Sequence, residues 1–330
     1  MQAPESNQST FFDLAMQQRG GANRVLETIA REVDLSEAEA RVASTYSQGG
    51  RPGCRVGVLL RIMILQHLYG LSDPQAEEQL KDRLSFQKFV QLQPEEGVPD
   101  ETTICRFRQR LIECSLHQEL LGLLNGQLEA RGYILKRTTL VDATLIESSR
   151  KRPDAQAARS GQAPDADARY TRKYHQSYYC YKAHLSSDGA HQLIRTAHIS
   201  AANVHDGDWL EQVAPRDAGS SLYADKAYDT KANKAWLLGH GIKSQIAKKG
   251  AHHIKLTECD RAENRRKSRV RSGIERVFAH LKKWQHYVRV RYLGLVKNQL
   301  ELTLKAVAYN LKRMASILAQ QNAKRAPQPR

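Results

Sequence analysis

The sequence has few cysteines, and they are scattered. Its 5 cysteines in 330 residues form no C-x-x-C pair, which excludes a disulfide scaffold and a zinc knuckle. We interpret them as reduced thiols of a cytoplasmic protein. Proline is also scarce, with 10 residues, and 26% of the chain is charged against 41% hydrophobic. This composition is typical of a folded protein and excludes disordered and collagen-like chains.

The sequence also lacks a long hydrophobic run. The longest apolar stretch, residues 56–71, is interrupted by Arg61, Gln66 and His67, so it does not predict a membrane-spanning helix. The opening residues lack the basic start and the apolar centre of a secretory signal. We therefore expect no membrane partner and a location in the cytoplasm.

Acidic residues are scarce in the second part of the chain. Residues 1–135 contain 14 Lys and Arg against 18 Asp and Glu, whereas residues 136–330 contain 37 against 17. This asymmetry predicts that the second part faces a polyanion. Because no basic anchor helix or lipidation motif is present, nucleic acid is the favoured partner. The alternative is a basic surplus that only aids solubility.

Helical patterns fill residues 1–135, which we interpret as an all-helical domain of helix-turn-helix type for DNA binding or dimerisation. Residues 56–69 predict an apolar helix that ends at Gly70, and Ser72 or Asp73 caps the next one. A further helix over residues 104–114 places Arg106 and Arg110 on one face. This face either contacts DNA phosphates or is simply solvated.

From about residue 136 the pattern changes to strands and helices. Residues 138–148 alternate in a β-rich pattern, and Asp188-Gly189 predicts a hairpin between two further strands. Two later strands alternate with helices, so residues 136–330 predict an α/β fold with a mixed sheet flanked by helices. Residues 150–177 are interpreted as a long loop, and residues 248–270 as a basic, irregular insert.

Three acidic residues stand out by their positions. Asp142 lies in an apolar strand, Asp225 follows another, and Glu275 lies on an amphipathic helix that also carries Arg271 and Lys282. A carboxylate in an apolar strand is costly to desolvate unless it is paired or binds metal. The structural alternatives are a strand-end cap for Asp142, a turn residue for Asp225, and a salt bridge between Glu275 and Arg271.

These carboxylates predict a metal site on a basic surface. Carboxylate oxygens are ligands for Mg²⁺ or Mn²⁺. Two such ions can activate a water or a 3′-hydroxyl and stabilise the leaving oxygen of a phosphodiester. The predicted chemistry is therefore metal-dependent cleavage and transfer of DNA strands.

Several motifs in order resemble the DDE transposases of bacterial insertion sequences, most closely the fifth insertion-sequence family. Residues 141–144 (VDAT) match its first motif, residues 225–229 (DKAYD) match its second, and Arg271, Glu275 and Lys282 match its third. The Tyr of the third motif is replaced by Ser268. Residues 203–206 (NVHD) and 181–184 (YKAH) also fit, although Cys180 stands where Gly is usual. The likeness covers about residues 40–315.

This resemblance implies an RNase H-like catalytic domain with Asp142, Asp225 and Glu275 as catalytic and metal-binding residues. It implies Arg271, Lys282 and Lys226 as DNA contacts. The implied partners are double-stranded DNA, as terminal inverted repeats and as target, and a second copy of the chain in a homodimer. The implied place of action is the nucleoid in the cytoplasm.

Two other functions remain open from the sequence. One is a catalytically inactive DNA-binding derivative of a transposase, against which the intact acidic trio argues. The other is a metal-dependent phosphohydrolase that uses His205 and Asp206 with His184, His252 or His253. No helical histidine spacing supports this second alternative.

Overall fold

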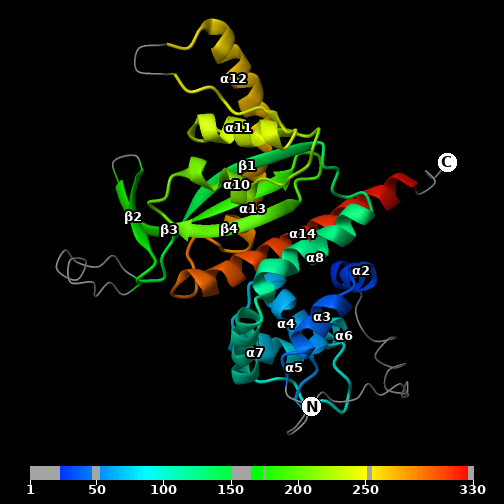
Figure 1. The fold of residues 1–330 in the computed structure, drawn as a ribbon. Coiled ribbons are helices and arrows are strands. Elements are labelled where there is room, and N and C mark those ends of the chain that lie inside the picture. The colour runs from blue at the N-terminus through cyan, green and yellow to red at the C-terminus, as the bar shows by residue number, and fades with distance from the viewer. Residues whose placement is uncertain (1–22, 47–52, 151–164, 174–175, 251–254, 326–330) are drawn as a thin grey trace. The chain divides into compact units, whose positions relative to one another are not determined.

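The computed structural model describes residues 23–46, 53–150, 165–173, 176–250 and 255–325 (Figure 1). The chain divides into two units, one formed by residues 1–127 with 307–330 and the other by residues 128–306. Within the described residues, every helix is too short or too polar to cross a bilayer. His252 and His253, which one alternative site would use, lie outside the described residues.

The first unit is built from helices. Its core helix is α4, and the apolar side chains of this helix are buried on all sides, as expected for a helix enclosed by others. The helices are α2 (Arg24–Glu32), α3 (Ser36–Ala43), α4 (Val56–Tyr69), α5 (Asp73–Asp82), α6 (Leu84–Val90), α7 (Glu101–Glu113), most of α8 (Leu116–Ala130) and the end of α14 (Leu295–Arg325).

Local signals set the helix boundaries in this unit. Helix α4 ends at Gly70, whose φ of 72° lies in the left-handed region that glycine favours. Ser72 forms a capping box with Gln75 at the start of α5, and the Asp100 carboxylate accepts a hydrogen bond from the Thr103 amide at the start of α7. The predicted helices over residues 56–69 and 104–114 are thus confirmed.

The second unit is organised around a six-stranded mixed sheet. Its main order is β4-β3-β1-β5-β6, and β2 pairs with the first part of β3. Strands β1, β3 and β4 run antiparallel, whereas β1, β5 and β6 run parallel. This is the predicted RNase H-like arrangement. The strands are β1 (Thr138–Glu147), β2 (Arg169–Lys173), β3 (Gln176–Asp188), β4 (Ile194–Ala201), β5 (Ser221–Tyr223) and β6 (Lys243–Ser244).

Helices flank the sheet of the second unit. Val141 and Leu222 pack in a core with Leu210 and Leu237, which α10 and α11 contribute. The junction of α12 and α13 packs closely on β1. A Cβ atom at Gly273 would lie 2.9 Å from the Leu140 side chain, so this contact favours glycine. The helices are η1 (Asp206–Trp209), α10 (Leu210–Val213), η2 (Lys226–Tyr228), α11 (Lys231–Gly239), α12 (Glu258–Arg271) and α13 (Gly273–Trp284).

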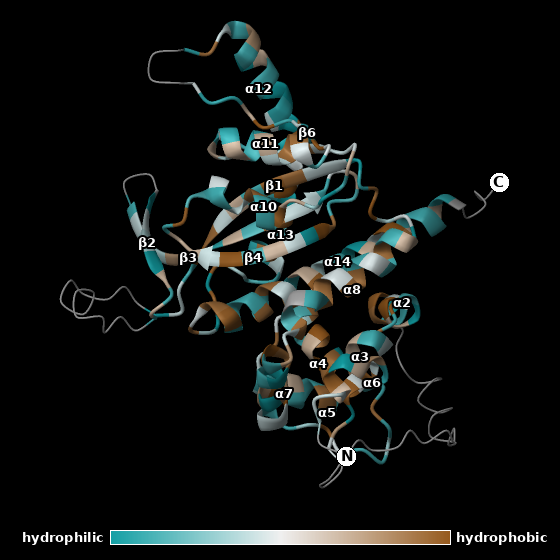
Figure 2. Cartoon of the chain, in the orientation of Figure 1, coloured by the Kyte–Doolittle hydropathy of each residue, from teal (hydrophilic) through white to brown (hydrophobic). Residues whose placement is uncertain are grey.

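Two predicted irregular segments contain regular structure. Strand β2 lies within residues 150–177, which the sequence predicted to be a loop, and it forms because its backbone pairs with β3. Most of residues 248–270 belongs to helix α12 rather than to an irregular insert. Figure 2 colours α12 as mostly hydrophilic, so it has no apolar stripe to reveal it. Its start is fixed by a capping box between Thr257 and Asp260.

Candidate active site

Asp142 and Asp225 lie at equivalent positions on two neighbouring parallel strands. Leu140 of β1 is paired with Tyr223 of β5, and each aspartate lies two residues further along its chain. Because parallel strands run in register, both side chains reach the same edge of the sheet. The sequence could place each aspartate near the end of a strand, and the strand register brings the two together.

Asp142 is a desolvated carboxyl group among other charges. Burial raises its pKa to about 6, the Arg271 guanidinium acts in the opposite direction, and the Asp225 and Asp206 carboxylates raise the pKa further. The oxygens of Asp142 are held by the Ala143 amide, at 2.9 Å, and by Arg271. The Asp142 side chain is 19% exposed, so a ligand can still reach it.

Asp225 is held by the turn that follows β5. Its side chain accepts a hydrogen bond from the Ala227 amide at 2.7 Å and thereby caps η2. Asp225 is thus a turn residue, the structural role that the sequence left open for it. A cap uses one carboxylate oxygen and is compatible with a second role for the other oxygen.

Asp206 is a third carboxylate at this edge of the sheet. It forms an ion pair with Lys182 at 2.7 Å, and Lys182 also donates a hydrogen bond to the Val204 carbonyl. Asp206 is close enough to raise the pKa of both Asp142 and Tyr228. The sequence had suggested Asp206 only as part of a histidine site. The sequence feature that marked Asp206 was the NVHD motif at residues 203–206.

The loop that carries Asp206 is fastened to the loop that carries Asp225. The Asn233 side-chain amide donates to the Gly207 carbonyl at 2.9 Å and to the Tyr228 carbonyl at 3.0 Å. A Cβ at Gly207 would lie 2.7 Å from the Ala227 carbonyl oxygen, so only glycine allows this close approach. Sequence reasoning missed Asn233, since nothing in its local sequence indicates these contacts.

Tyr228 places a buried hydroxyl against the three aspartates. The side chain is fully buried, and among the described residues its hydroxyl has no hydrogen-bond partner. Burial raises the pKa of Tyr228 well above its ordinary value, and the charges of Asp206, Asp142 and Asp225 add to this effect. The hydroxyl therefore stays protonated and remains a potential donor.

Arg271 lies between Asp142 and Glu275. It forms an ion pair with Asp142, and its second nitrogen lies 3.9 Å from a Glu275 carboxylate oxygen. Glu275 is in the first turn of α13, and its side chain is 63% exposed. The structure thus brings Asp142, Asp225 and Arg271 together and places Glu275 at the outer side of Arg271.

The aspartates fit a divalent cation in part. Among the described residues, no three acidic, histidine or cysteine side chains are grouped as a metal site. Asp142 and Asp225 nevertheless offer carboxylate oxygens at one edge, and a bound cation would stabilise the desolvated Asp142 carboxylate beside its acidic neighbour. A third carboxylate ligand would have to come from Glu275. Arg271 lies between Glu275 and Asp142.

Among the described residues, His184 and His205 do not converge on these acids as a ligand set. The His205 ring accepts a hydrogen bond from the Gly207 amide at 3.1 Å and so caps η1. His184 is fully buried, bonded to the Ser200 hydroxyl at 2.8 Å and stacked on Trp209. Burial lowers the pKa of His184 to about 4. These contacts explain both rings as structural.

The predicted cationic residues differ in how they are engaged. Lys226 is exposed beside Asp225, and Lys282 lies in the last turn of α13. In the first unit, Arg106 is exposed on α7. Arg110 donates to the Thr45 carbonyl at 2.9 Å and lies 4.1 Å from the ring centre of Tyr46. Arg110 therefore has a structural role in that unit.

Two family models match the chain. The model described as Transposase DDE domain matches residues 134–311, which is more than half of the chain. The model described as Transposase domain (DUF772) matches residues 14–110. The first match includes both strands that lead to Asp142 and Asp225, as well as Arg271 and Glu275.

Two solved structures align with most of the chain at low similarity. One is the cryo-EM structure of the piggyBac transposase synaptic complex with hairpin DNA, at 8% identity and a TM-score of 0.37, covering 96% of this chain and 82% of that one. The other is the crystal structure of a pre-cleavage Mos1 transpososome, at 9% identity and a TM-score of 0.20, covering 90% and 98%. The family assignment rests on the two sequence matches.

Proposed function

This chain belongs to the Transposase DDE domain family and is a DDE-type DNA transposase, and we propose that Asp142, Asp225 and Glu275 are its catalytic carboxylates. In this proposal the protein cleaves the ends of an insertion sequence and joins them to target DNA. The observation that carries the proposal is the strand register that places Asp142, inside β1, next to Asp225, which follows the parallel strand β5. A desolvated carboxyl group such as Asp142 beside a second acid is costly in a purely structural role.

The family implies a dependence on divalent metal, and the acidic residues indicate where it binds. Asp142, Asp225 and Glu275 would hold Mg²⁺ or Mn²⁺, in our proposal two ions. Bound there, such ions would supply activation of a water or a 3′-hydroxyl and stabilisation of the leaving oxygen of the phosphodiester. Tyr228 remains protonated beside the carboxylate cluster, so it adds no further negative charge to it.

Arg271 couples DNA binding to the exposure of Asp142. A guanidinium binds phosphate as readily as carboxylate, so a DNA phosphate competes with Asp142 for Arg271. When Arg271 turns to the phosphate, the ion pair that separates Asp142 from Glu275 is broken. Lys226 and Lys282 contact further phosphates of the transposon end.

The remaining assignments concern assembly on DNA. The helical domain, residues 1–135 in the sequence-based division, binds DNA or mediates dimerisation, and Arg106 is its exposed candidate contact, with Arg110 beside it. The catalytic domain spans residues 136–330. A homodimer binds both terminal inverted repeats and the target duplex, and it acts at the nucleoid in the cytoplasm.

Strand cleavage by the Asp142→Asn variant tests the catalytic assignment. The substrate is a DNA fragment that carries the inverted repeats flanking the gene, incubated with Mg²⁺ or Mn²⁺. We expect cleavage to fall by at least about 100-fold, because the amide is a poor metal ligand, while DNA binding is retained. Asp208→Asn, which changes an exposed aspartate on η1, is the matched control and should cleave normally.

Cleavage by Asp142→Asn at the rate of the unaltered protein would refute the catalytic assignment. If the unaltered protein binds these ends but never cuts them with either metal, it is an inactive DNA-binding derivative.

A further inference from the structure

A cleft of about 570 Å³ opens directly beside Asp225. It lies between the end of β5, the segment that follows β6 and the middle of α12. Its polar lining includes Asp225, Lys226, Lys248, Lys249, Ser268 and Arg271, and its apolar lining includes Ala224 and Leu256. Because Asp225 and Arg271 belong to the candidate active site, the cleft is continuous with that site.

The segment after β6 continues the parallel ladder beyond the strand itself. The Gln245 amide donates to the Leu222 carbonyl at 2.8 Å, and the Ala247 amide donates to the Ala224 carbonyl at 3.1 Å. These hydrogen bonds place Ala247 beside the residue that precedes Asp225. Lys248 and Lys249 therefore follow the same edge of the sheet that carries the catalytic aspartates.

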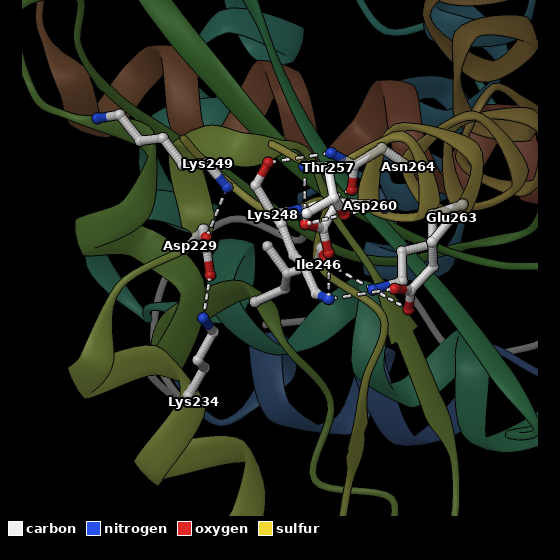
Figure 3. A network of polar contacts seen from close by, with 10 residues as sticks. Asp229, Lys234, Ile246, Lys248, Lys249, Thr257, Asp260, Glu263 and Asn264 are labelled. Atoms are coloured by element: carbon white, nitrogen blue, oxygen red, sulfur yellow. Dashed lines mark hydrogen bonds and ion pairs between the residues drawn. The ribbon is translucent and has the colours of Figure 1, made fainter. Parts of the chain in front are cut away.

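A network of polar contacts fixes this segment to its neighbours (Figure 3). The Asn264 side chain accepts from the Lys248 amide at 2.9 Å and donates to its carbonyl at 3.0 Å. The Lys249 amide donates to Asp229 at 2.8 Å, and the Lys267 ammonium donates to the Ile246 carbonyl at 3.1 Å. The wall of the cleft is thus held at three backbone positions.

In the same network, the acidic residues close to the cleft form ion pairs with lysines. Asp260 and Glu263 form ion pairs with Lys248 at 2.7 and 3.4 Å, and Asp229 is paired with Lys234. Asp225 is the one acid among the residues that line the cleft. Lys248 and Arg271 are paired with acids, whereas no ion pair to a described acid is formed by Lys226 or Lys249.

Two lysines are left available to a ligand. Lys226 and Lys249 are exposed and line the cleft. Neither ammonium group has an ion pair or a hydrogen bond to the residues that the structure describes. With the paired Lys248 and Arg271 they give the cleft four cationic side chains, and Figure 2 shows that α12 beside it is mostly hydrophilic.

We propose that this cleft binds the sugar–phosphate backbone of one DNA strand as it leaves the catalytic centre, with Lys226 and Lys249 contacting separate phosphates. This inference rests on the proposed function. Fixed walls and unpaired ammonium groups match a repeating polyanion, since ammonium groups bind phosphates without reading the bases. Nucleic acid is favoured over a small anion, because the cleft extends from the site where the phosphodiester reacts.

Ser268 gives the cleft part of its width. It lies three residues before Arg271 on α12, at the position where the family motif carries a tyrosine. A serine there leaves space that a larger side chain would fill. Ser268→Tyr should therefore obstruct the cleft without changing the charge of the protein.

Salt-dependent DNA binding tests the cleft without any catalytic step. The probe is a fluorescein-labelled duplex spanning one end of the element and its flanking DNA, and its binding to the full chain is measured by anisotropy in EDTA over a range of NaCl concentrations. The slope of log K against log salt changes by about 0.9 for each phosphate contact. For Lys226→Ala combined with Lys249→Ala, we expect the slope to become shallower by about 1.8.

The control double variant combines Lys231→Ala and Lys243→Ala. Both lysines are exposed in the same unit, and neither lines the cleft, so the net charge changes equally. The control should retain the slope of the unaltered protein. Ser268→Tyr should bind about tenfold more weakly than the unaltered protein and show a shallower slope, while Ser268→Ala should bind normally.

Equal slopes for the two lysine double variants would overturn the cleft proposal, and so would normal binding by Ser268→Tyr. Circular dichroism of each variant shows that the fold is intact. Failure of the cleft proposal is distinguishable from failure of the proposed function. If the slopes are equal while Mg²⁺-dependent cleavage still requires Asp142, the function stands without the cleft.

Discussion

The partly buried pair of Arg108 and Asp73 in the first unit differs in its surroundings from the pair of Arg271 and Asp142 in the second unit. In the first unit, Arg108 of α7 binds Asp73 of α5 through two nitrogens, one of them at 2.9 Å. Asp73 also accepts a hydrogen bond from the Gln66 side chain at 2.7 Å. Both oxygens of the Asp73 carboxylate therefore accept hydrogen bonds.

In the second unit, the pair of Arg271 and Asp142 lies among like charges. Arg271 binds Asp142 through one nitrogen, while Asp225 and Asp206 raise the pKa of the same carboxyl. The same two residue types thus form a hydrogen-bonded structural contact in the first unit, which we call the satisfied pair. In the second unit they form part of a cluster of like charges, which we call the strained site. The comparison indicates that the neighbours of a buried ion pair, rather than the pair itself, distinguish structure from function.

The largest effect on stability is expected from breaking the satisfied pair. Arg108→Ala leaves the Asp73 carboxylate partly buried without its main partner, which should lower the free energy of unfolding by about 3–5 kcal/mol. Urea unfolding followed by circular dichroism measures this loss. Arg106→Ala, two residues away and exposed, should change it by less than about 0.5 kcal/mol. If both variants change the free energy of unfolding equally little, the pair of Arg108 and Asp73 does not stabilise the first unit.

A gain in stability is expected from relieving the strained site. The folded protein holds the Asp142 proton more tightly than the unfolded chain does, because burial raises the pKa from 3.8 to about 6. The free energy of unfolding therefore falls as the pH rises through this window, and the loss is complete above it. Asp142→Asn removes the titration.

At neutral pH, the free energy of unfolding of Asp142→Asn should exceed that of the unaltered protein by about 2–3 kcal/mol, since one pKa unit corresponds to about 1.4 kcal/mol. Below pH 3.8 the two proteins should be equally stable. Urea titrations in EDTA at both pH values measure the difference. A variant that is less stable at neutral pH would show that Asp142 is a satisfied structural acid like Asp73.

Much of the fold could be predicted from local sequence. The apolar run of residues 56–69 and Gly70 define α4, and Asp188-Gly189 marks the hairpin of β3 and β4. These features depend on neighbouring residues alone. Helix α12 was missed because it is polar throughout, although its capping box at Thr257 was present in the sequence. A polar helix held by long-range side-chain contacts gives no periodic signal.

The candidate site was predictable only in part for a related reason. The sequence marks Asp142 and Asp225 as acids in apolar surroundings and Glu275 as a helical neighbour of Arg271. The Leu140–Tyr223 register, which brings the aspartates together, is a tertiary feature. The attachment of the Asp206 loop through Asn233 likewise joins segments that no local pattern connects.

The smallest effect on stability is expected at the exposed end of the strained site. Glu275 is 63% exposed, so Glu275→Gln should change the free energy of unfolding by less than about 0.5 kcal/mol. Its DNA cleavage should nevertheless fall by at least about 100-fold, because an amide does not replace a metal-binding carboxylate. Arg276→Gln, at the adjacent exposed position, is the control for stability. Normal cleavage by Glu275→Gln would show that the site is complete without this residue and would confine the catalytic carboxylates to the desolvated aspartates, where the electrostatic strain is concentrated.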